Sequence, residues 1–276
     1  MIKSKTLNIH NNNNVLYITF PKLDKIGGVR HAFSTRFGGI SEGQTASMNF
    51  SFTLDESADA VKENFRIFCR AVGFDSEKIV LSKQTHTSNI RAVSEEDIGK
   101  GVWRELDYDN VDGLVTNVPE IVLVTQYADC TPLIFFDPVT KTAATSHAGW
   151  RGTALEIAKK TVEFMRDNYG VNPSDIIAAI GPSIASCCYE VDDPVIDIIN
   201  SLSYLDKSLC YTKKDNGKYM LDLREVNRQI LIHAGVLADN IDVADLCTSC
   251  NSNIFHSHRA TGGKRGTLAA MISIKK

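Results

Sequence analysis

Residues 143–158, AATSHAGWRGTALEIA, constrain the fold of this chain more than any other segment. Small and β-branched residues lead up to His147, a pattern typical of a buried strand. A turn flanked by glycines follows, and Thr153 and Glu156 then stand at the spacing of a capping box, which marks the start of a helix. We therefore expect a strand, a tight turn and a helix N-terminus in direct succession, as in layered folds of helices and sheets.

Apolar runs elsewhere in the chain predict further strands and helices. The segments that favour strands are Val15–Phe20, Ile79–Ser82, Ile121–Gln126, Leu133–Phe136, Thr142–His147, Ile176–Ile180 and Leu268–Ile274. The segments that favour helices, each closed by a glycine, are Ala58–Val72, Thr153–Tyr169 and Leu223–Ala234. Strands and helices mix without strict alternation, so we expect an α/β to α+β fold in which mixed β-sheets are flanked by helices.

No repeat, Pro-rich linker or block of charge divides the 276 residues. We therefore expect residues 15–276 to form a single catalytic domain. The only low-complexity stretch is Asn11–Asn14. It indicates either a turn or the end of a flexible N-terminal lead-in over residues 1–14.

Charge and composition exclude several classes of protein. The formal net charge of -3 argues against a general nucleic-acid binder. The N-terminus lacks the apolar run of a signal peptide, and no window is apolar enough to span a membrane. We therefore expect a cytoplasmic protein, in which the seven cysteines stay reduced and form no disulfide framework. The sequence does not distinguish a monomer from a small homo-oligomer.

Three residues of metal-binding type stand near the ends of predicted strands. His147 ends one strand, Cys130 lies just before the run Leu133–Phe136, and His86 lies between two strand-like runs. Two imidazoles and one thiolate suit a catalytic zinc ion, with a fourth position left open. Spacing alone favours structural roles, with His147 as a hydrogen-bonding group and Cys130 as a small buried side chain, so a metal site depends on the three residues meeting in the fold.

Two neighbouring residues could support such a site. If the segment around His86 is extended, Gln84 shares its face and could orient the imidazole or contact a substrate. Arg151 follows the glycine turn and has a planar cation suited to phosphate or carboxylate. With the helix dipole it predicts an anion site, although Trp150 and Arg151 could simply cover the helix end.

Six motifs occur in a distinctive order, and together they resemble those of the YfiH-like family, labelled polyphenol oxidase or laccase domain proteins. The motifs are HAFSTRFGG (31–39), QTH (84–86), DG-VT (112–116), ADCTPL (128–133), HAGWRGT (147–153) and IGPSI-CCYEV (180–191). The resemblance implies layered helices and sheets with the site in a surface pocket. It also implies a zinc-containing purine nucleoside phosphorylase that acts on adenosine, inosine and S-methyl-5′-thioadenosine and has adenosine deaminase activity.

Carried over residue by residue, the family's metal ligands fall on His86, Cys130 and His147. The loop HRATGGKRG (258–266) lacks an acidic residue of the family pattern, which leaves the role of that loop open. For phosphate, the first candidate is Arg151 with the helix N-terminus at Thr153, and the second is Arg36. Asn49 and Gln84 are candidates for contacts to ribose or base, although polar residues in turns need no ligand.

Deamination also requires a group that moves protons, and Asp129, next to Cys130, is our candidate. Neighbouring residues on a strand point to opposite faces, so Asp129 can reach the site only if the backbone turns there. Its carboxylate could instead cap that turn.

The same residues bear on other possible functions. A multicopper oxidase needs more imidazoles than the seven histidines of this chain. A mononuclear copper oxidase stays possible because two histidines and a cysteine also bind copper. An amidase that edits peptidoglycan precursors would use the same pocket, whereas a non-catalytic binding module would need a fourth protein ligand on the metal.

The remaining cysteines give a weaker signal. Cys247-x-x-Cys250, with His256 and His258 beyond it, suggests a second metal or redox site, but a single CxxC is weak evidence. Adjacent Cys187 and Cys188 would point in opposite directions in an extended segment, so we do not expect them to chelate a metal together.

Overall fold

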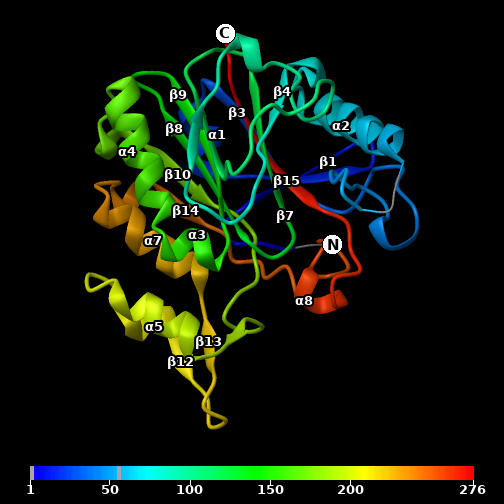
Figure 1. Cartoon of the computed structure of the whole chain (residues 1–276). Coiled ribbons are helices and arrows are strands. Elements are labelled where there is room, and N and C mark those ends of the chain that lie inside the picture. Colours follow the sequence, from blue (N-terminus) through cyan, green and yellow to red (C-terminus); the bar gives the residue numbers. More distant parts are fainter. Residues whose placement is uncertain (1–2, 55–56) are drawn as a thin grey trace.

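The computed structural model describes residues 3–54 and 57–276, and these form four layers (Figure 1). Two mixed β-sheets pack face to face in the middle, and helices cover their outer faces. The first sheet has the spatial order β1 (Asn8–Asn12), β2 (Val15–Thr19), β3 (Val29–Ser34), β15 (Leu268–Ile274), β7 (Val122–Tyr127) and β4 (Ile79–Leu81). The second has the order β14 (Ile241–Val243), β10 (Ile177–Ile180), β8 (Thr131–Asp137), β9 (Thr142–Ala148), β6 (Gly113–Thr116) and β5 (Ile90–Ala92).

Helices cover the two sheets from opposite sides. On the first sheet lies α2 (Ala58–Val72), and on the second lie α4 (Ile157–Tyr169) and α7 (Leu223–His233). The shorter helices are α1 (Pro21–Ile26), α3 (Trp150–Ala154), α5 (Asp193–Ser201), α6 (Lys207–Cys210) and α8 (His258–Thr261). A small third sheet of β11 (Glu190–Val191), β13 (Tyr219–Leu221) and β12 (Tyr211–Lys213) extends from the lower end of the molecule in Figure 1.

Short 3₁₀ turns connect several of these elements. They span Gly43–Thr45, Ser76–Lys78, Glu95–Asp97, Pro173–Asp175 and Ala238–Asn240. No helix among residues 3–54 and 57–276 is both long and apolar enough to cross a membrane.

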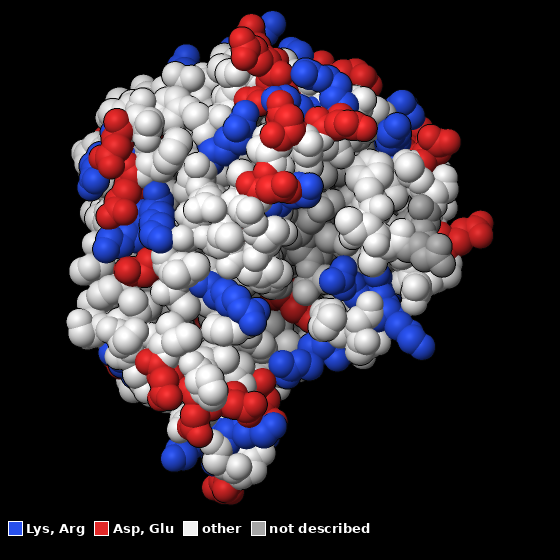
Figure 2. Space-filling view, viewed as in Figure 1, with Lys and Arg blue, Asp and Glu red and all other residues white. Residues whose placement is uncertain are grey.

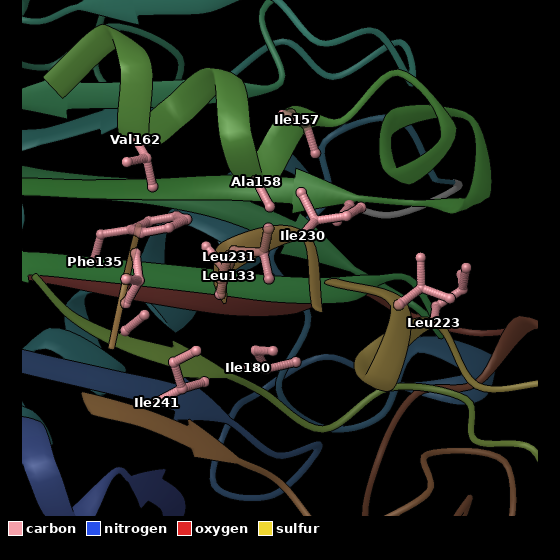
Figure 3. Packing of buried hydrophobic residues seen from close by; sticks show 14 of the residues in the cluster. Leu133, Phe135, Ile157, Ala158, Val162, Ile180, Leu223, Ile230, Leu231 and Ile241 are labelled. Carbon is pink, nitrogen blue, oxygen red and sulfur yellow. The ribbon is translucent and has the colours of Figure 1, made fainter. Parts of the chain in front are cut away.

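The central strands bury side chains on both faces, which explains their uninterrupted apolar runs. Along β8, Leu133 and Phe135 pack against α4 and α7 (Figure 3), whereas Ile134 and Phe136 face the first sheet. Along β15, alternate residues such as Met271 pack toward α2 instead. β8 and β15 therefore each contribute to two apolar layers.

The layered fold predicted from the sequence is confirmed, and several predicted elements agree closely with the structure. Ala58–Val72 and Leu268–Ile274 form α2 and β15 with the expected bounds. Gly73 closes α2 in the left-handed conformation with φ 92°, and its N–H donates to the Cys69 carbonyl. A glycine adopts this conformation without the steric cost that a Cβ would bring.

The capping box predicted at Thr153 and Glu156 is wrong. The helix begins earlier, at Trp150, and the Thr153 N–H already donates to the Gly149 carbonyl at 2.8 Å. Glu156 adopts φ 57° and separates α3 from α4, whose first turn forms as the Lys160 N–H donates to the Glu156 carbonyl. The single helix predicted over Thr153–Tyr169 is therefore divided between two helices, α3 and α4.

The asparagine run lies in a hairpin. Residues 8–12, which we expected in a flexible lead-in, pair with β2 as strand β1. Asn13 and Asn14 have φ of 51° and 66° and form the two-residue turn. Positive φ at both positions is the requirement of a type I′ hairpin, and asparagine tolerates it better than most residues.

Candidate metal centre

His86, Cys130 and His147 converge at one end of the two central sheets. Their ligand atoms all lie within 4.8 Å of one another. Cys130 Sγ is 3.9 Å from His86 Nε2, and the two imidazole rings are 4.8 Å apart between centroids. The donor set is one thiolate and two imidazoles, which fits a metal such as zinc or copper. The site could therefore bind a metal ion through these three residues.

Local backbone turns bring the three side chains together. Cys130 lies in the turn between β7 and β8, where Asp129 adopts φ 87°. His86 itself has φ 65°, so the segment that follows β4 is bent rather than extended. His147 is the penultimate residue of β9 and is buried.

Asp112 holds two of these segments in place. Its buried carboxylate accepts a hydrogen bond from His147 Nδ1 at 2.8 Å and others from the backbone N–H groups of Thr85, His86 and Thr87. A bond to Nδ1 leaves Nε2 of His147 directed at the site, as in carboxylate–histidine–metal arrangements. Sequence reasoning missed Asp112, although it is the first residue of the DG-VT motif.

The charges in the site favour a thiolate. Burial raises the pKa of Cys130, but His147 and then His86 outweigh this and lower it to about 6. Burial lowers the pKa of His147, but the Cys130 thiolate and the Asp112 carboxylate raise it to about 9. Without a metal the pair is thus a thiolate and an imidazolium near pH 7. A metal ion would take the place of the Nε2 proton of His147.

Gly149 is required by the close approach of these residues. A Cβ at this position would lie 2.8 Å from His86 Cδ2 and 3.1 Å from Cys130 Sγ. The turn from β9 into α3 therefore passes directly against two of the three ligands.

The three ligands line a cavity of about 770 Å³, within the range of small-molecule sites. Trp150 and Tyr189 contribute apolar surface to it, and Arg259 and Arg265 contribute positive charge. Figure 2 shows the surface hollowed beside α8, with Lys and Arg side chains around the hollow.

Arg265 is the second residue that sequence reasoning missed. Among the described residues, its buried Nε has no hydrogen-bond partner. Burial lowers the pKa of its guanidinium by more than the nearby Asp129 and Cys130 raise it. An arginine that is half-buried, cationic and incompletely bonded at a cavity wall is suited to an anionic ligand. The signal in the sequence was the loop 258–266, whose role the family pattern had left open.

Asp129 lines the same cavity, and the backbone turns as its proposed role requires. Its carboxylate accepts hydrogen bonds from Thr248 Oγ1 at 2.6 Å, Ser257 Oγ at 3.0 Å and the Arg259 N–H at 2.7 Å. The residue thereby ties the Cys130 turn to the segment before and within α8.

Gln84 also lines the cavity, but its amide is bonded to β7. Its Nε2 donates to the Gln126 carbonyl at 2.7 Å, and its Oε1 accepts from the Gln126 N–H at 2.7 Å. The interpretation that Gln84 shares an extended face with His86 is wrong, because the backbone bends at His86.

The other predicted binding residues lie outside the cavity lining. Arg151 is exposed and lies over the Trp150 ring, 4.4 Å from its centroid. Arg36 donates to the carbonyls of Ala46 and Ser252. Asn49 is buried, and its Oδ1 accepts from the N–H groups of Ser51 and Thr267. The structure therefore does not bring Arg36 and Asn49 to the site.

Comparison with known proteins identifies relatives over most of the chain. A model of the family described as multi-copper polyphenol oxidoreductase laccase matches residues 30–275. Purine nucleoside phosphorylase YlmD of Bacillus subtilis is 37% identical over 247 residues, 88% of each chain. Adenosine deaminase RL5, from an unknown prokaryotic organism, is 34% identical over 261 residues, 90% of this chain and 96% of that one.

A solved structure extends the likeness to the fold. The hypothetical protein YfiH of Bacillus licheniformis superposes with a TM-score of 0.90 at 36% identity, over 97% of this chain and 99% of that one. The residues matched by the family model, 30–275, include the segments that supply His86, Cys130 and His147. The chain therefore belongs to the YfiH-like family of multi-copper polyphenol oxidoreductase laccase proteins.

Proposed function

We propose that this protein is a zinc-dependent purine nucleoside phosphorylase that acts on adenosine, inosine and S-methyl-5′-thioadenosine and also deaminates adenosine. The observation that carries the proposal is that three metal ligands and two arginines line one cavity. The name of YlmD supports the phosphorylase activity, and the name of RL5 supports the deaminase activity.

Zinc is the proposed metal, held by His86, Cys130 and His147. When bound, it supplies an electrophilic centre that attracts anions and lowers the pKa of water. Copper accepts the same ligands, but both proposed reactions displace a group without electron transfer, and zinc has no redox chemistry.

In phosphorolysis, a phosphate oxygen bonds to C1′ of the ribose as the bond from C1′ to the purine nitrogen breaks. The purine leaves with the bonding electrons and gains the proton that dihydrogen phosphate loses. The transition state carries positive charge on the sugar, so placement of the anion matters most. We assign phosphate binding to Arg265 and Arg259, with Arg151 beside Trp150 as a further contact. Gln84 is assigned a contact to the nucleoside.

In deamination, water adds to C6 of adenosine and ammonia leaves, so that inosine remains. The reaction needs a group that takes a proton from the water and returns it to the departing amine. Asp129 is proposed for this step because it lines the cavity next to Cys130.

Ligand counting argues against multicopper oxidase chemistry despite the family's description. Within residues 3–54 and 57–276, the potential metal ligands form two groups, and only the group around His86 contains histidine. His31 and His256 are engaged elsewhere, with the Phe20 N–H and the Met48 carbonyl respectively. A trinuclear copper cluster has no set of imidazoles among these residues.

The proposal is tested by incubating the protein with adenosine, with and without phosphate, and separating the products by chromatography. Adenine and ribose 1-phosphate formed only with phosphate demonstrate phosphorolysis, and inosine formed without it demonstrates deamination. Cys130→Ser is expected to abolish both. If the zinc-loaded protein forms neither phosphorolysis products nor inosine, the proposal is contradicted.

A further inference from the structure

We propose that Cys187, Cys188, Cys247 and Cys250 bind a second zinc ion in a closed, structural site beside the cavity. The four sulfur atoms all lie within 4.8 Å of one another. Cys250 Sγ is 3.3 Å from both Cys187 Sγ and Cys188 Sγ. In tetrahedral coordination with Zn–S distances of about 2.3 Å, the sulfurs stand about 3.8 Å apart. The cluster therefore needs only small rotations of its side chains to enclose the ion.

Two facing turns create the cluster. The N–H groups of Cys188 and Tyr189 both donate to the Ala185 carbonyl at 2.9 Å, so this segment is a tight turn. The prediction that Cys187 and Cys188 point apart assumed an extended strand and is wrong. The facing turn carries the CxxC motif, and the Asn251 N–H donates to the Cys247 carbonyl at 3.1 Å.

Hydrogen bonds to sulfur prepare Cys247 for a metal. The Ala185 N–H donates to its Sγ at 3.4 Å, and the Cys250 backbone donates to the same atom. N–H donors stabilise the thiolate, which is the form that binds zinc.

Cys247 and Cys188 pack in a small apolar cluster with Ile184 and Ala185, but apolar packing does not account for Cys187 and Cys250. Cys69 and Cys210 are buried in apolar clusters, as is usual for a free cysteine. By contrast, Cys187 and Cys250 are exposed. His256, which the sequence had suggested as a partner of the CxxC motif, is instead bonded to the Met48 carbonyl and the Gly266 N–H.

The second zinc ion would join two walls of the cavity. The first turn is followed directly by Tyr189, and α8 follows the second turn and supplies Arg259. The Arg259 guanidinium already donates to the Cys188 carbonyl at 3.0 Å, so a cation lies close to the four sulfurs. Four protein ligands leave no open position, which fits a structural rather than a catalytic ion.

The experiment is elemental analysis of protein purified under reducing conditions from zinc-supplemented cells. We expect two zinc ions per chain in the wild type and one in Cys250→Ser. We also expect one in Cys130→Ser, which removes a ligand of the first site only. Ser249→Ala changes the same turn without removing a thiol and should retain two. Cys187→Ser provides an independent loss of one ion should Cys250→Ser fail to fold.

Cobalt provides a readout of the ligands themselves. Cobalt-loaded Cys130→Ser should show the intense thiolate charge-transfer and tetrahedral d–d bands of a four-sulfur site, and these should vanish when Cys250→Ser is added. A zinc content that Cys250→Ser and Cys187→Ser leave unchanged would overturn the proposal. So would a wild-type mass lower by two hydrogens, with a disulfide mapped to Cys250.

Discussion

Asp112 contributes no ligand to the metal centre, yet more of the site depends on it than on any single ligand. One buried carboxylate receives the His147 ring and three consecutive N–H groups of the His86 loop. Burial raises the pKa of this carboxyl, but His147 and the loop N–H groups outweigh burial and lower it to about 2. It is therefore an anion at every pH at which the protein is expected to function.

Asp112→Asn should lower zinc affinity by about 10–100-fold, as other losses of a ligand's hydrogen-bond partner do. The amide removes the negative charge and places an NH₂ group against one of the N–H donors. Affinity is measured by competition with a chelator. Asp137→Asn is the matched control, because Asp137 is equally buried and, among the described residues, its carboxylate is bonded within its own turn, to Val139 and Thr140. Equal affinities in the two variants would contradict this role.

Arg265→Gln should raise the KM for phosphate about tenfold or more, because hydrogen bonds to charged groups contribute about 1.5–3 kcal/mol. The KM for the nucleoside should change less. Steady-state kinetics at varied phosphate concentration check this, with Arg151→Gln in parallel to test the role first predicted for that residue. If only Arg151→Gln raises the KM, the phosphate site lies over Trp150 instead.

The convergence of His86, Cys130 and His147 could be predicted from the sequence because each stands in a recognisable motif. Asp112 and Arg265 could not, for different reasons. The role of Asp112 exists only through neighbours distant in the chain, since no local spacing links it to His147. Arg265 lies in a loop where this chain departs from the family pattern, so the resemblance gave no guidance.

At the scale of elements, one residue at the junction of β9 and α3, Gly149, both caps the helix and leaves room for two residues of the metal centre. Gly149 is the N-cap of α3, and its φ of -67° is open to any amino acid. The restriction is spatial, because His86 and Cys130 occupy the place of a side chain.

Gly149→Ala should therefore weaken zinc binding at least about tenfold with little change in fold, since the added methyl displaces two ligands. Gly170→Ala should instead lower the stability of the fold and leave zinc binding unchanged. Gly170 closes α4 with φ 68° and open space around it, so alanine there costs about 1 kcal/mol of stability and leaves the metal centre intact. Zinc titration and urea unfolding of both variants distinguish the two effects. Normal zinc affinity in Gly149→Ala would refute the steric argument.

Long elements with strong patterns, such as α2 and β15, could be predicted almost to the residue. The short strands β5, β11 and β12 could not, because two or three residues carry no periodicity. The helix break at Glu156 could not be predicted from the sequence either. A left-handed glutamate has no local sequence signature, and it is fixed here by the start of α4.

At the scale of the whole molecule, two buried histidines affect stability as the pH changes. Burial lowers the pKa values of His31 and His256 to about 4. His31 Nε2 accepts from the Phe20 N–H at 2.8 Å, which requires the neutral ring. Since the folded pKa lies below the unfolded value of 6.5, the unfolded chain binds protons first as pH falls.

The free energy of unfolding should accordingly fall between about pH 6.5 and pH 4, by roughly 2–3 kcal/mol for each histidine. Urea unfolding at several pH values measures the slope. His31→Gln and His256→Gln should each flatten it, because glutamine keeps hydrogen-bonding groups but does not titrate. The carboxyl of Asp97 stabilises the folded protein above this range, and its contribution is lost only at lower pH, since its pKa falls from 3.8 to about 2 on folding. An unchanged slope in both variants would disprove the assignment.

The arrangement of two stacked sheets could not be deduced from the sequence. Strands that bury both faces show no alternation, so their apolar runs do not reveal which layer each side chain joins. The partners of β15, namely β3 and β7, come from widely separated parts of the chain.

The position of β15 also has a consequence for synthesis on the ribosome. This strand lies between β3 and β7, and it is made after every other strand described here. Until residue 274 has left the ribosome, the first sheet consists of two separate halves with unpaired edges, which are prone to aggregation. A nascent chain stalled after residue 267 should therefore stay sensitive to protease and bound by chaperones, although the second sheet and all its strands are already made.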